Sequence, residues 1–434
     1  MRRVLLLAGL AALVLPASAF AHATLQSTTP HFGHELQTSP RSIRLHFDQR
    51  VKILPGAISV LNTHGRNFAG RARTSGTDVI APVAKLPTGA YTVRWRAISA
   101  DSHVVSGVWT FGVRVPAPSV NDAYGAGGPT IAEHLVRWVW FLSLAFAIGT
   151  LGLRLVCLRG VPVPRALERR LAVAAGLGVA VSLQAGIAAF SLRAEDALQL
   201  PFGRFLYGDL SPMAVTRFGR AFIVMTLGFA LVLALIYLAW LLDRTVFLVP
   251  AFALSLLFVS GFSLSGHDAV DPGSSWKSEL ADWVHISAAS LWVGGLAALV
   301  GLVWYGAPDL RRVAFRRFSE LATVSIALVL AAGTYLSIVR LPHLHDLWTV
   351  GYGQVLLVKI GLVSCVLAWG GFHKFVIAPA LERSDSVGFL TRIGRSLAGE
   401  SLLGAAVLLV AAILTDSRPP AQPAKTPPAA AARR

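Results

Sequence analysis

Beyond residue 130, eight long apolar runs follow one another, and they limit the fold more than any other feature of this 434-residue chain. Each run approaches the roughly 20 residues that a helix needs to cross about 30 Å of hydrocarbon. The sequence therefore predicts a bundle of eight transmembrane helices. We place them near residues 132–156, 170–192, 219–242, 245–266, 282–304, 319–340, 354–376 and 396–415.

Composition and charge agree with a membrane protein. The chain is 54% hydrophobic and only 14% charged, whereas about a quarter of the residues are charged in typical soluble domains. This composition excludes an ordinary cytosolic enzyme and a disordered chain. The net charge of +17 would also suit nucleic-acid binding, but the arginines cluster between apolar runs. That pattern is typical of the positive-inside rule, so we expect a lipid bilayer and no nucleic acid as partner.

Basic residues set the expected orientation. They gather after the first, third, fifth and seventh runs, so these alternate loops share one side, which the rule assigns to the cytoplasm. With an even number of spans, both ends of the membrane part face the exported side. We therefore expect a multi-pass protein of the bacterial inner membrane. The residues concerned are Arg159, Arg165, Arg169, Arg170, Arg244, Arg311, Arg312, Arg316, Arg317, Lys374, Arg383, Arg392 and Arg395.

The first 21 residues have the pattern of a secretory signal peptide. Arg2 and Arg3 precede an apolar run that is too short to span a membrane comfortably, and Ala19-Phe20-Ala21 supplies a small-residue cleavage site. Cleavage after Ala21 would make His22 the mature N-terminus. The segment that follows would then lie on the periplasmic side.

Residues 22–115 differ from the rest of the chain. Apolar residues alternate with polar ones at Ile43, Leu45 and Phe47, again around Val93, and less cleanly after Val108, with proline and glycine turns between. This predicts a small β-sandwich or barrel. Residues 116–130 are rich in proline and glycine and are interpreted as a linker, 131–415 as the membrane domain, and 416–434 as a disordered Pro/Ala-rich tail.

Three residues of the β region suggest a metal centre. A mature N-terminal His22 offers its α-amine and a ring nitrogen. Asp101 and His103 are two residues apart, which places both side chains on one face of a strand. Three nitrogens and a carboxylate can form the tetragonal site that Cu(II) favours. We predict His22, Asp101 and His103 as metal ligands, with copper as the metal.

The β region resembles the CopC family of periplasmic copper proteins. The resemblance rests on His22-Ala-Thr-Leu, Gly89-Ala-Tyr-Thr-Val-Arg-Trp-Arg96 and Ser99-Ala-Asp101-Ser-His103, and it spans residues 22–114. It implies a cupredoxin-like Greek-key β-barrel with a Cu(II) site at His22, Asp101 and His103. Residues 130–415 resemble the CopD family of copper-resistance membrane proteins at Ser265-Gly-His267-Asp268, Asp282-Trp-Val-His285 and Tyr352-Gly-Gln through Lys359. This second resemblance implies copper handling in the inner membrane.

Five histidines of the membrane part are expected near the exported side, where the β region lies. They are interpreted as a candidate copper path, because ionisable groups at membrane depth tend to line cavities. Solvated loops, an interfacial anchor and a hydrogen bond between helices remain the alternatives. His373 is interpreted as structural, or as marking the cytoplasmic exit, and Glu400 is expected to snorkel to the cytoplasm. The path comprises His134, His267, His285, His343 and His345, with Asp282 on the same helical face as His285.

The favoured function is periplasmic copper binding and delivery of copper to or across the inner membrane, without enzymatic activity. Expected partners are copper ions and periplasmic or cytoplasmic copper chaperones. One alternative is a membrane haem protein for electron transfer, with paired histidines such as His134 and His285. The other is a copper oxidase-type enzyme with a histidine brace, which the carboxylate of Asp101 argues against.

Overall fold

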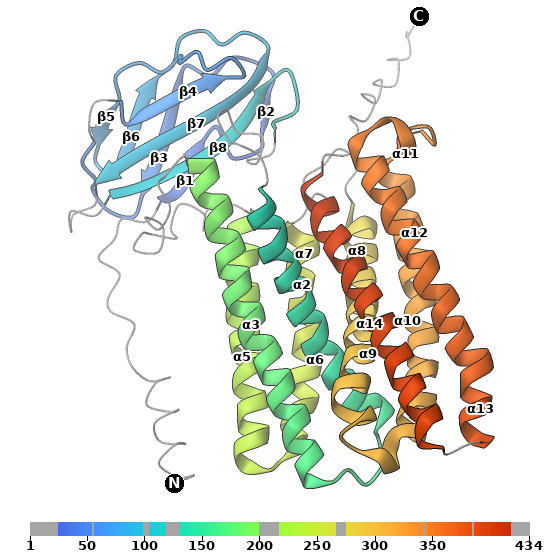
Figure 1. The fold of residues 1–434 in the computed structure, drawn as a ribbon. Coiled ribbons are helices and arrows are strands. Elements are labelled where there is room, and N and C mark those ends of the chain that lie inside the picture. Colours follow the sequence, from blue (N-terminus) through green and yellow to red (C-terminus); the bar gives the residue numbers. More distant parts are fainter. Residues whose placement is uncertain are drawn as a thin grey trace, which may run out of the picture.

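The computed structural model describes residues 25–53, 56–98, 104–118, 130–198, 217–265, 275–341, 343–383 and 386–417. A β domain is followed along the chain by a helical membrane domain (Figure 1). The predicted signal peptide and the residues His22, Asp101, His103 and His267 lie outside the described residues.

Two four-stranded sheets form the β domain, in the orders β1-β3-β6-β5 and β2-β8-β7-β4. Neighbouring strands are antiparallel except for β2 and β8, which are parallel. The predicted β-sandwich class is confirmed. The strands are β1 Leu25–Thr29, β2 Glu35–Leu36, β3 Ser42–Phe47, β4 Ile58–Asn62, β5 Arg73–Ser75, β6 Asp78–Pro82, β7 Gly89–Ile98 and β8 Val104–Val113.

The sandwich core comes from the alternating residues that the sequence indicates. Ile43 and Phe47 of β3 are fully buried, and the Phe47 ring meets Trp95 of β7 edge to face, with centroids 5.4 Å apart. Tyr91 also faces the core and donates a hydrogen bond from its hydroxyl to the Pro87 carbonyl at 2.8 Å. Burial raises the pKa of Tyr91, so the phenol stays protonated and keeps this bond.

Strand β8 is buried on both faces, which explains its irregular pattern. Trp109 and Phe111 belong to the sandwich core. Val108 points the other way and joins the apolar cluster of the membrane domain, where β8 contacts helix α3 (Arg165–Leu198). A strand covered on both sides has no solvent face to carry polar residues, so period two is lost.

Eight helical spans in the described chain are long and apolar enough to cross a membrane, as the sequence predicts. Several begin earlier than their apolar runs, because helices continue into polar residues beyond the hydrocarbon. The last, for example, begins at Val387 rather than near residue 396. The spans are Ile131–Cys157, Arg165–Leu192, Ala221–Leu242, Thr245–Phe262, Trp276–Trp304, Pro308–Arg340, Gly351–Arg383 and Val387–Thr415.

Four π-helical segments lie within these spans or at their ends, and several spans consist of more than one helix. The helices in chain order, with their π-helical segments, are α2 Ile131–Gly152, η2 Leu153–Cys157, α3, α5 Arg217–Leu242, α6 Leu248–Phe258, α7 Ser260–Ser265, α8 Trp276–Ala289, η6 Ser290–Gly294, α9 Gly295–Ala298, η7 Leu299–Trp304, α10 Arg311–Arg340, α11 Asp346–Thr349, α12 Gly351–Phe372, η9 His373–Ile377, α13 Ala378–Arg383 and α14 Val387–Asp416.

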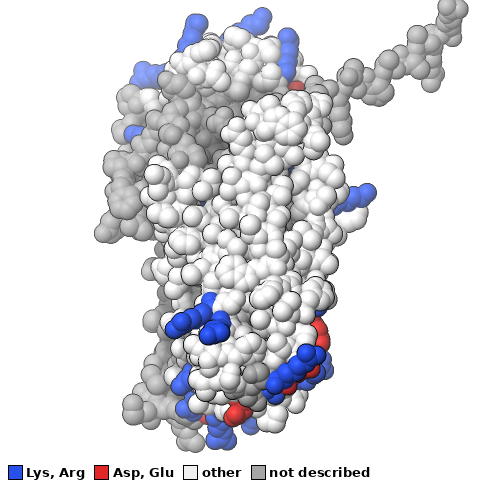
Figure 2. All heavy atoms as spheres, turned by 45° about the vertical axis from the view of Figure 1, so that its right-hand side comes forward, with Lys and Arg blue, Asp and Glu red and all other residues white. Residues whose placement is uncertain are grey.

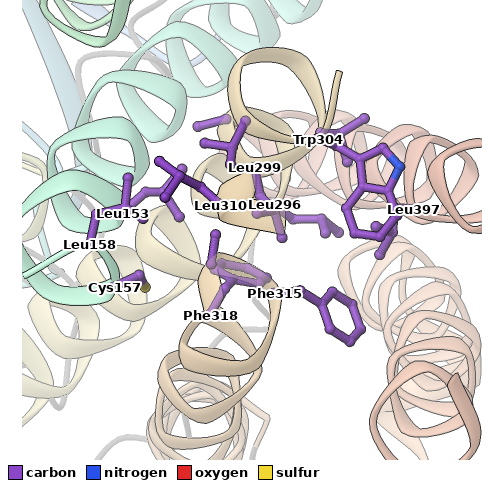
Figure 3. Close-up of a cluster of buried hydrophobic side chains, with 14 of the residues drawn as sticks. Leu153, Cys157, Leu158, Leu296, Leu299, Trp304, Leu310, Phe315, Phe318 and Leu397 are labelled. Carbon is purple, nitrogen blue, oxygen red and sulfur yellow. The ribbon is translucent and has the colours of Figure 1, made fainter. Parts of the chain in front are cut away.

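Tight packing fixes the centre of the bundle. The backbones of α2 and η6 touch: a Cβ on Gly294 would lie 1.7 Å from the Ala145 carbonyl oxygen, so no larger residue fits there. Beside this crossing, Trp304, Phe315 and Leu397 belong to a buried apolar cluster shared by several helices (Figure 3).

The two ends of the bundle differ. At the β-domain end, α2, α8 and α12 begin and α3 reaches β8 (Figure 1). At the opposite end, which we call the arginine-rich end, α3 and α10 begin with arginine, and α14 carries Arg392 and Arg395 in its first three turns. On the face shown in Figure 2, a white band with few charges lies between charged regions. This is the distribution expected of a bilayer-spanning bundle.

Candidate functional site

The strand ends that flank the three predicted copper ligands meet at one end of the sandwich. Leu25, three residues after His22, pairs with Phe47 at the end of β3. Lys52, five residues further on, bridges to Ile98 at the end of β7, and Ile98 pairs with Val104 at the start of β8. The segments on both sides of Asp101 and His103 therefore lie close to the strand that follows His22.

The described histidines of the β domain have other surroundings. His46 is exposed on the outer face of β3, and its Nδ1 lies 2.6 Å from Asp78 Oδ1. The rings of His31 and His34 are exposed and meet edge to face, with centroids 5.5 Å apart. In the described part of the chain, no group of three or more His, Cys, Asp or Glu residues is placed to hold a metal.

Three histidines of the predicted path lie at the very end of the membrane domain that faces the β domain. His134 is in the first turn of α2 and is half-buried. His343 and His345 precede α11 and are exposed, with their rings stacked 5.4 Å apart. Buried Asp346 anchors this loop: its Oδ2 accepts a hydrogen bond from the His343 backbone N–H at 3.0 Å, and its Oδ1 lies 3.3 Å from His345 Nε2.

His285 lies deeper, between α8 and α10. Its Nδ1 is 3.1 Å from the Val329 carbonyl oxygen, and Gly333 leaves room for the ring. Because a carbonyl only accepts, Nδ1 carries the hydrogen and Nε2 keeps a lone pair in the neutral ring, as in metal-ligating histidines. The interhelical hydrogen bond that was one alternative for His285 is therefore present.

The charges around His285 disfavour a bare cation. Lys359 of α12 and Arg340 of α10 are close enough to act on the imidazole electrostatically, while Asp282 acts on Lys359. Copper at His285 would have to bind beside these two cationic side chains, which repel it, so the copper role of His285 stays a prediction.

A second polar cluster joins η9 to α14, and here the expectation for Glu400 was wrong. Its side chain does not snorkel but is buried at 4% exposure, with Oε2 2.5 Å from Nδ1 of equally buried His373. The Nε2 of His373 lies 2.8 Å from Ser396 Oγ, which accepts a hydrogen bond from Trp369 Nε1 at 3.0 Å. The sequence could have indicated the burial of Glu400 only if the start of α14 had been known, because that start places Glu400 well inside the helix.

Known families match both parts of the chain. The CopC domain family matches residues 25–114, and the Copper resistance protein D family matches residues 312–414. The second match covers less of the membrane domain than the resemblance stated above, because it begins within α10.

The relatives match either nearly the whole chain or its β domain. The copper transport protein CutJ of Bacillus subtilis is 29% identical over 95% of this chain and 77% of its own. Copper resistance protein C of Pseudomonas syringae pv. tomato is 37% identical over 24% of this chain and 90% of its own. The crystal structure of CopC from Methylosinus trichosporium OB3b is 26% identical, covers 21% of this chain and 93% of that one, and gives a TM-score of 0.20. With its β domain in the CopC family and its last membrane helices in the CopD family, the chain belongs to the CopC–CopD fusion proteins.

Proposed function

We propose that this protein binds Cu(II) at its β domain and delivers copper to the membrane domain and across the inner membrane, without enzymatic activity. His22, Asp101 and His103 supply the binding site, with three nitrogens and one carboxylate. This donor set suits tetragonal Cu(II).

One observation carries the proposal: the described strand ends on both sides of the predicted ligands meet at the same end of the sandwich. One of these strands, β8, also leads toward the membrane domain. It begins at that end of the sandwich with Val104, and four residues later Val108 packs against the helices. At about 3.3 Å per residue, the start of β8 is only about 13 Å from this contact.

The membrane domain would receive copper at its β-domain end. His134, His343 and His345 lie there, with His285 further in, and His267 belongs to the same predicted path. The arginine-rich end is placed in the cytoplasm by the positive-inside rule, so the β domain faces the periplasm. Copper chaperones on either side are then natural donors or acceptors.

Copper binding is tested on the purified full chain by metal analysis and Cu(II) electron paramagnetic resonance. Wild type is expected to bind one Cu(II) with a nitrogen-rich signal, and His22→Ala, Asp101→Asn and His103→Ala each to lose it. The matched control is His64→Ala, which removes an exposed histidine of the same domain. A signal that survives all three ligand changes would refute the site. A haem absorption band in the purified protein would instead support an electron carrier.

Delivery across the bilayer is tested separately, with the protein reconstituted in liposomes and copper added outside. Wild type is expected to accumulate copper inside, and His103→Ala to slow this at low external copper. Empty liposomes and His64→Ala provide the baselines. Copper binding without any accumulation would leave a receptor or sensor and exclude transport.

A further inference from the structure

The cluster of His373, Glu400, Ser396 and Trp369 lies outside the predicted copper site and does not include any of the five histidines of the predicted path. It joins two segments of the chain, since His373 opens the π-helical segment η9 and Glu400 lies on α14. π-helical turns widen a helix locally and are frequent at functional sites. Glycine makes room for the carboxyl group, because a Cβ on Gly370 would lie 3.0 Å from Glu400 Oε1.

The pair lies at membrane depth. Glu400 is 13 residues after Val387, the first residue of α14, so it lies about 20 Å along the helix from the arginine-rich end. His373 and Glu400 are only 3% and 4% exposed. A lone carboxylate in such surroundings is costly, and the imidazole at 2.5 Å offsets that cost by sharing a proton with it.

Hydrogen-bond chemistry allows this pair two protonation states. Trp369 Nε1 only donates, so Ser396 Oγ accepts from it and remains available to His373 Nε2. In the protonated state Oε2–H donates to Nδ1 and Nε2–H donates to Ser396 Oγ, so the pair is neutral overall. In the deprotonated state Nδ1–H donates to the carboxylate Oε2 and the Ser396 hydroxyl donates to Nε2, so the pair carries one negative charge. Two protonation states thus share one geometry and differ by one unit of buried charge.

The charged side chains near this pair are either bonded to another residue or exposed. Lys374 of η9 donates from Nζ to Thr323 Oγ1 of α10 at 2.6 Å. On α14, Arg392 and Arg395 are exposed, as are Glu382 and Arg383 of α13 and Glu320 of α10. Within the described part of the chain, the charged partner of Glu400 is therefore His373.

We propose that His373 and Glu400 form a proton-binding site, and that copper passage through the membrane domain is coupled to release and recovery of this proton. When a copper cation passes, the proton of Glu400 Oε2 moves to His373 Nδ1 and the proton of Nε2 leaves, and the charge of the cation offsets the negative charge left on the pair. Rebinding of a proton resets the site. No electron is transferred in this step. The coupling rests on the copper transport proposed above.

The site itself is tested without copper. Infrared difference spectra of the wild-type protein in detergent, recorded between two pH values, are expected to show the C=O band of a protonated carboxyl group. Glu400→Gln should lose this band, because the amide has the same shape but cannot release a proton. The matched control Glu382→Gln removes an exposed carboxylate of α13 and should keep it. A band that is unchanged in Glu400→Gln overturns the proposal.

The coupling is tested in liposomes that contain a pH-sensitive dye. With wild type and Glu382→Gln, added copper should cause a proton movement that scales with the copper taken up, whereas Glu400→Gln should lose this movement. If wild type takes up copper with no proton movement, the coupling is refuted and the proposed transport stands. If wild type takes up no copper, transport fails and the coupling with it, while the infrared result still decides the proton site.

Ser396→Ala is a second variant that tests the site even if Glu400→Gln does not fold. It keeps both members of the pair and removes the hydroxyl beside Nε2. The carboxyl band should then titrate at a shifted pH. An identical titration would mean that the band does not belong to this pair, and would overturn the assignment.

Discussion

Two histidines each join a pair of helices in the membrane domain, and their partners differ in charge. His285 meets a backbone carbonyl of α10, within reach of two cationic side chains. His373 meets a buried carboxyl group and a serine of α14. The first imidazole is held by a neutral acceptor, so it can be lost at small cost. The second neutralises its partner, so its loss exposes a charge to the apolar interior.

Removal of His373 should therefore give the largest effect. His373→Ala leaves Glu400 buried without its imidazole, which is expected to lower the free energy of unfolding by about 3–5 kcal/mol. Denaturant unfolding in detergent, followed by circular dichroism, measures this. If His373→Ala lowered the free energy of unfolding less than His285→Ala does, the contrast drawn between the two histidines would be wrong.

Replacement of both partners should recover most of that loss. In His373→Leu with Glu400→Leu, no buried charge remains, and apolar side chains fill the space between η9 and α14. The double variant is expected to be more stable than either Glu400→Leu or His373→Leu alone. Strictly additive losses in the double-mutant cycle would show that the two residues do not act as a pair.

His285→Ala is expected to cost about 1 kcal/mol, the value of a hydrogen bond to a neutral acceptor. The remaining Val329 carbonyl still belongs to the backbone of α10, and the nearby Lys359 and Arg340 lose a group that they repel when it is charged. The same unfolding measurement applies. If His285→Ala lowered the free energy of unfolding as much as His373→Ala does, His285 would have to neutralise a buried charge as well as meet the Val329 carbonyl.

The smallest effect is expected at the exposed loop. His343→Ala should change the free energy of unfolding by no more than about 0.5 kcal/mol, because the ring is exposed and Asp346 bonds to the backbone N–H rather than to this ring. Liposome copper uptake at low copper should nevertheless slow if the ring serves the path. Unfolding and uptake that both match wild type would remove His343 from the path.

Local periodicity predicts much of this fold. The buried alternation at Ile43, Leu45 and Phe47 and the eight apolar runs are properties of short windows, which a sequence displays directly. The irregular pattern around Val108 was less informative, because the helix that covers its outer face lies far along the chain. Such a contact leaves no periodic signal within the strand.

The polar cluster at Glu400 was misjudged for a similar reason. Apolarity alone places the start of the last span near residue 396, where a glutamate could reach water by snorkelling. The helix in fact begins at Val387, and Arg392 and Arg395 follow in its first three turns, which places Glu400 more than three turns inward. The assignment of His22, Asp101 and His103 as copper ligands comes from donor chemistry and from resemblance to a known family, and it stays a prediction.

The contact of Val108 with the membrane helices also bears on the kinetics of the proposed transfer. A separate donor would have to find the membrane domain by diffusion, at a rate set by its abundance. In a single chain, donor and acceptor meet at an effective concentration that short linkers raise to the order of millimolar. The hand-over then becomes a first-order event, and its rate does not depend on how many copies of the protein the cell contains.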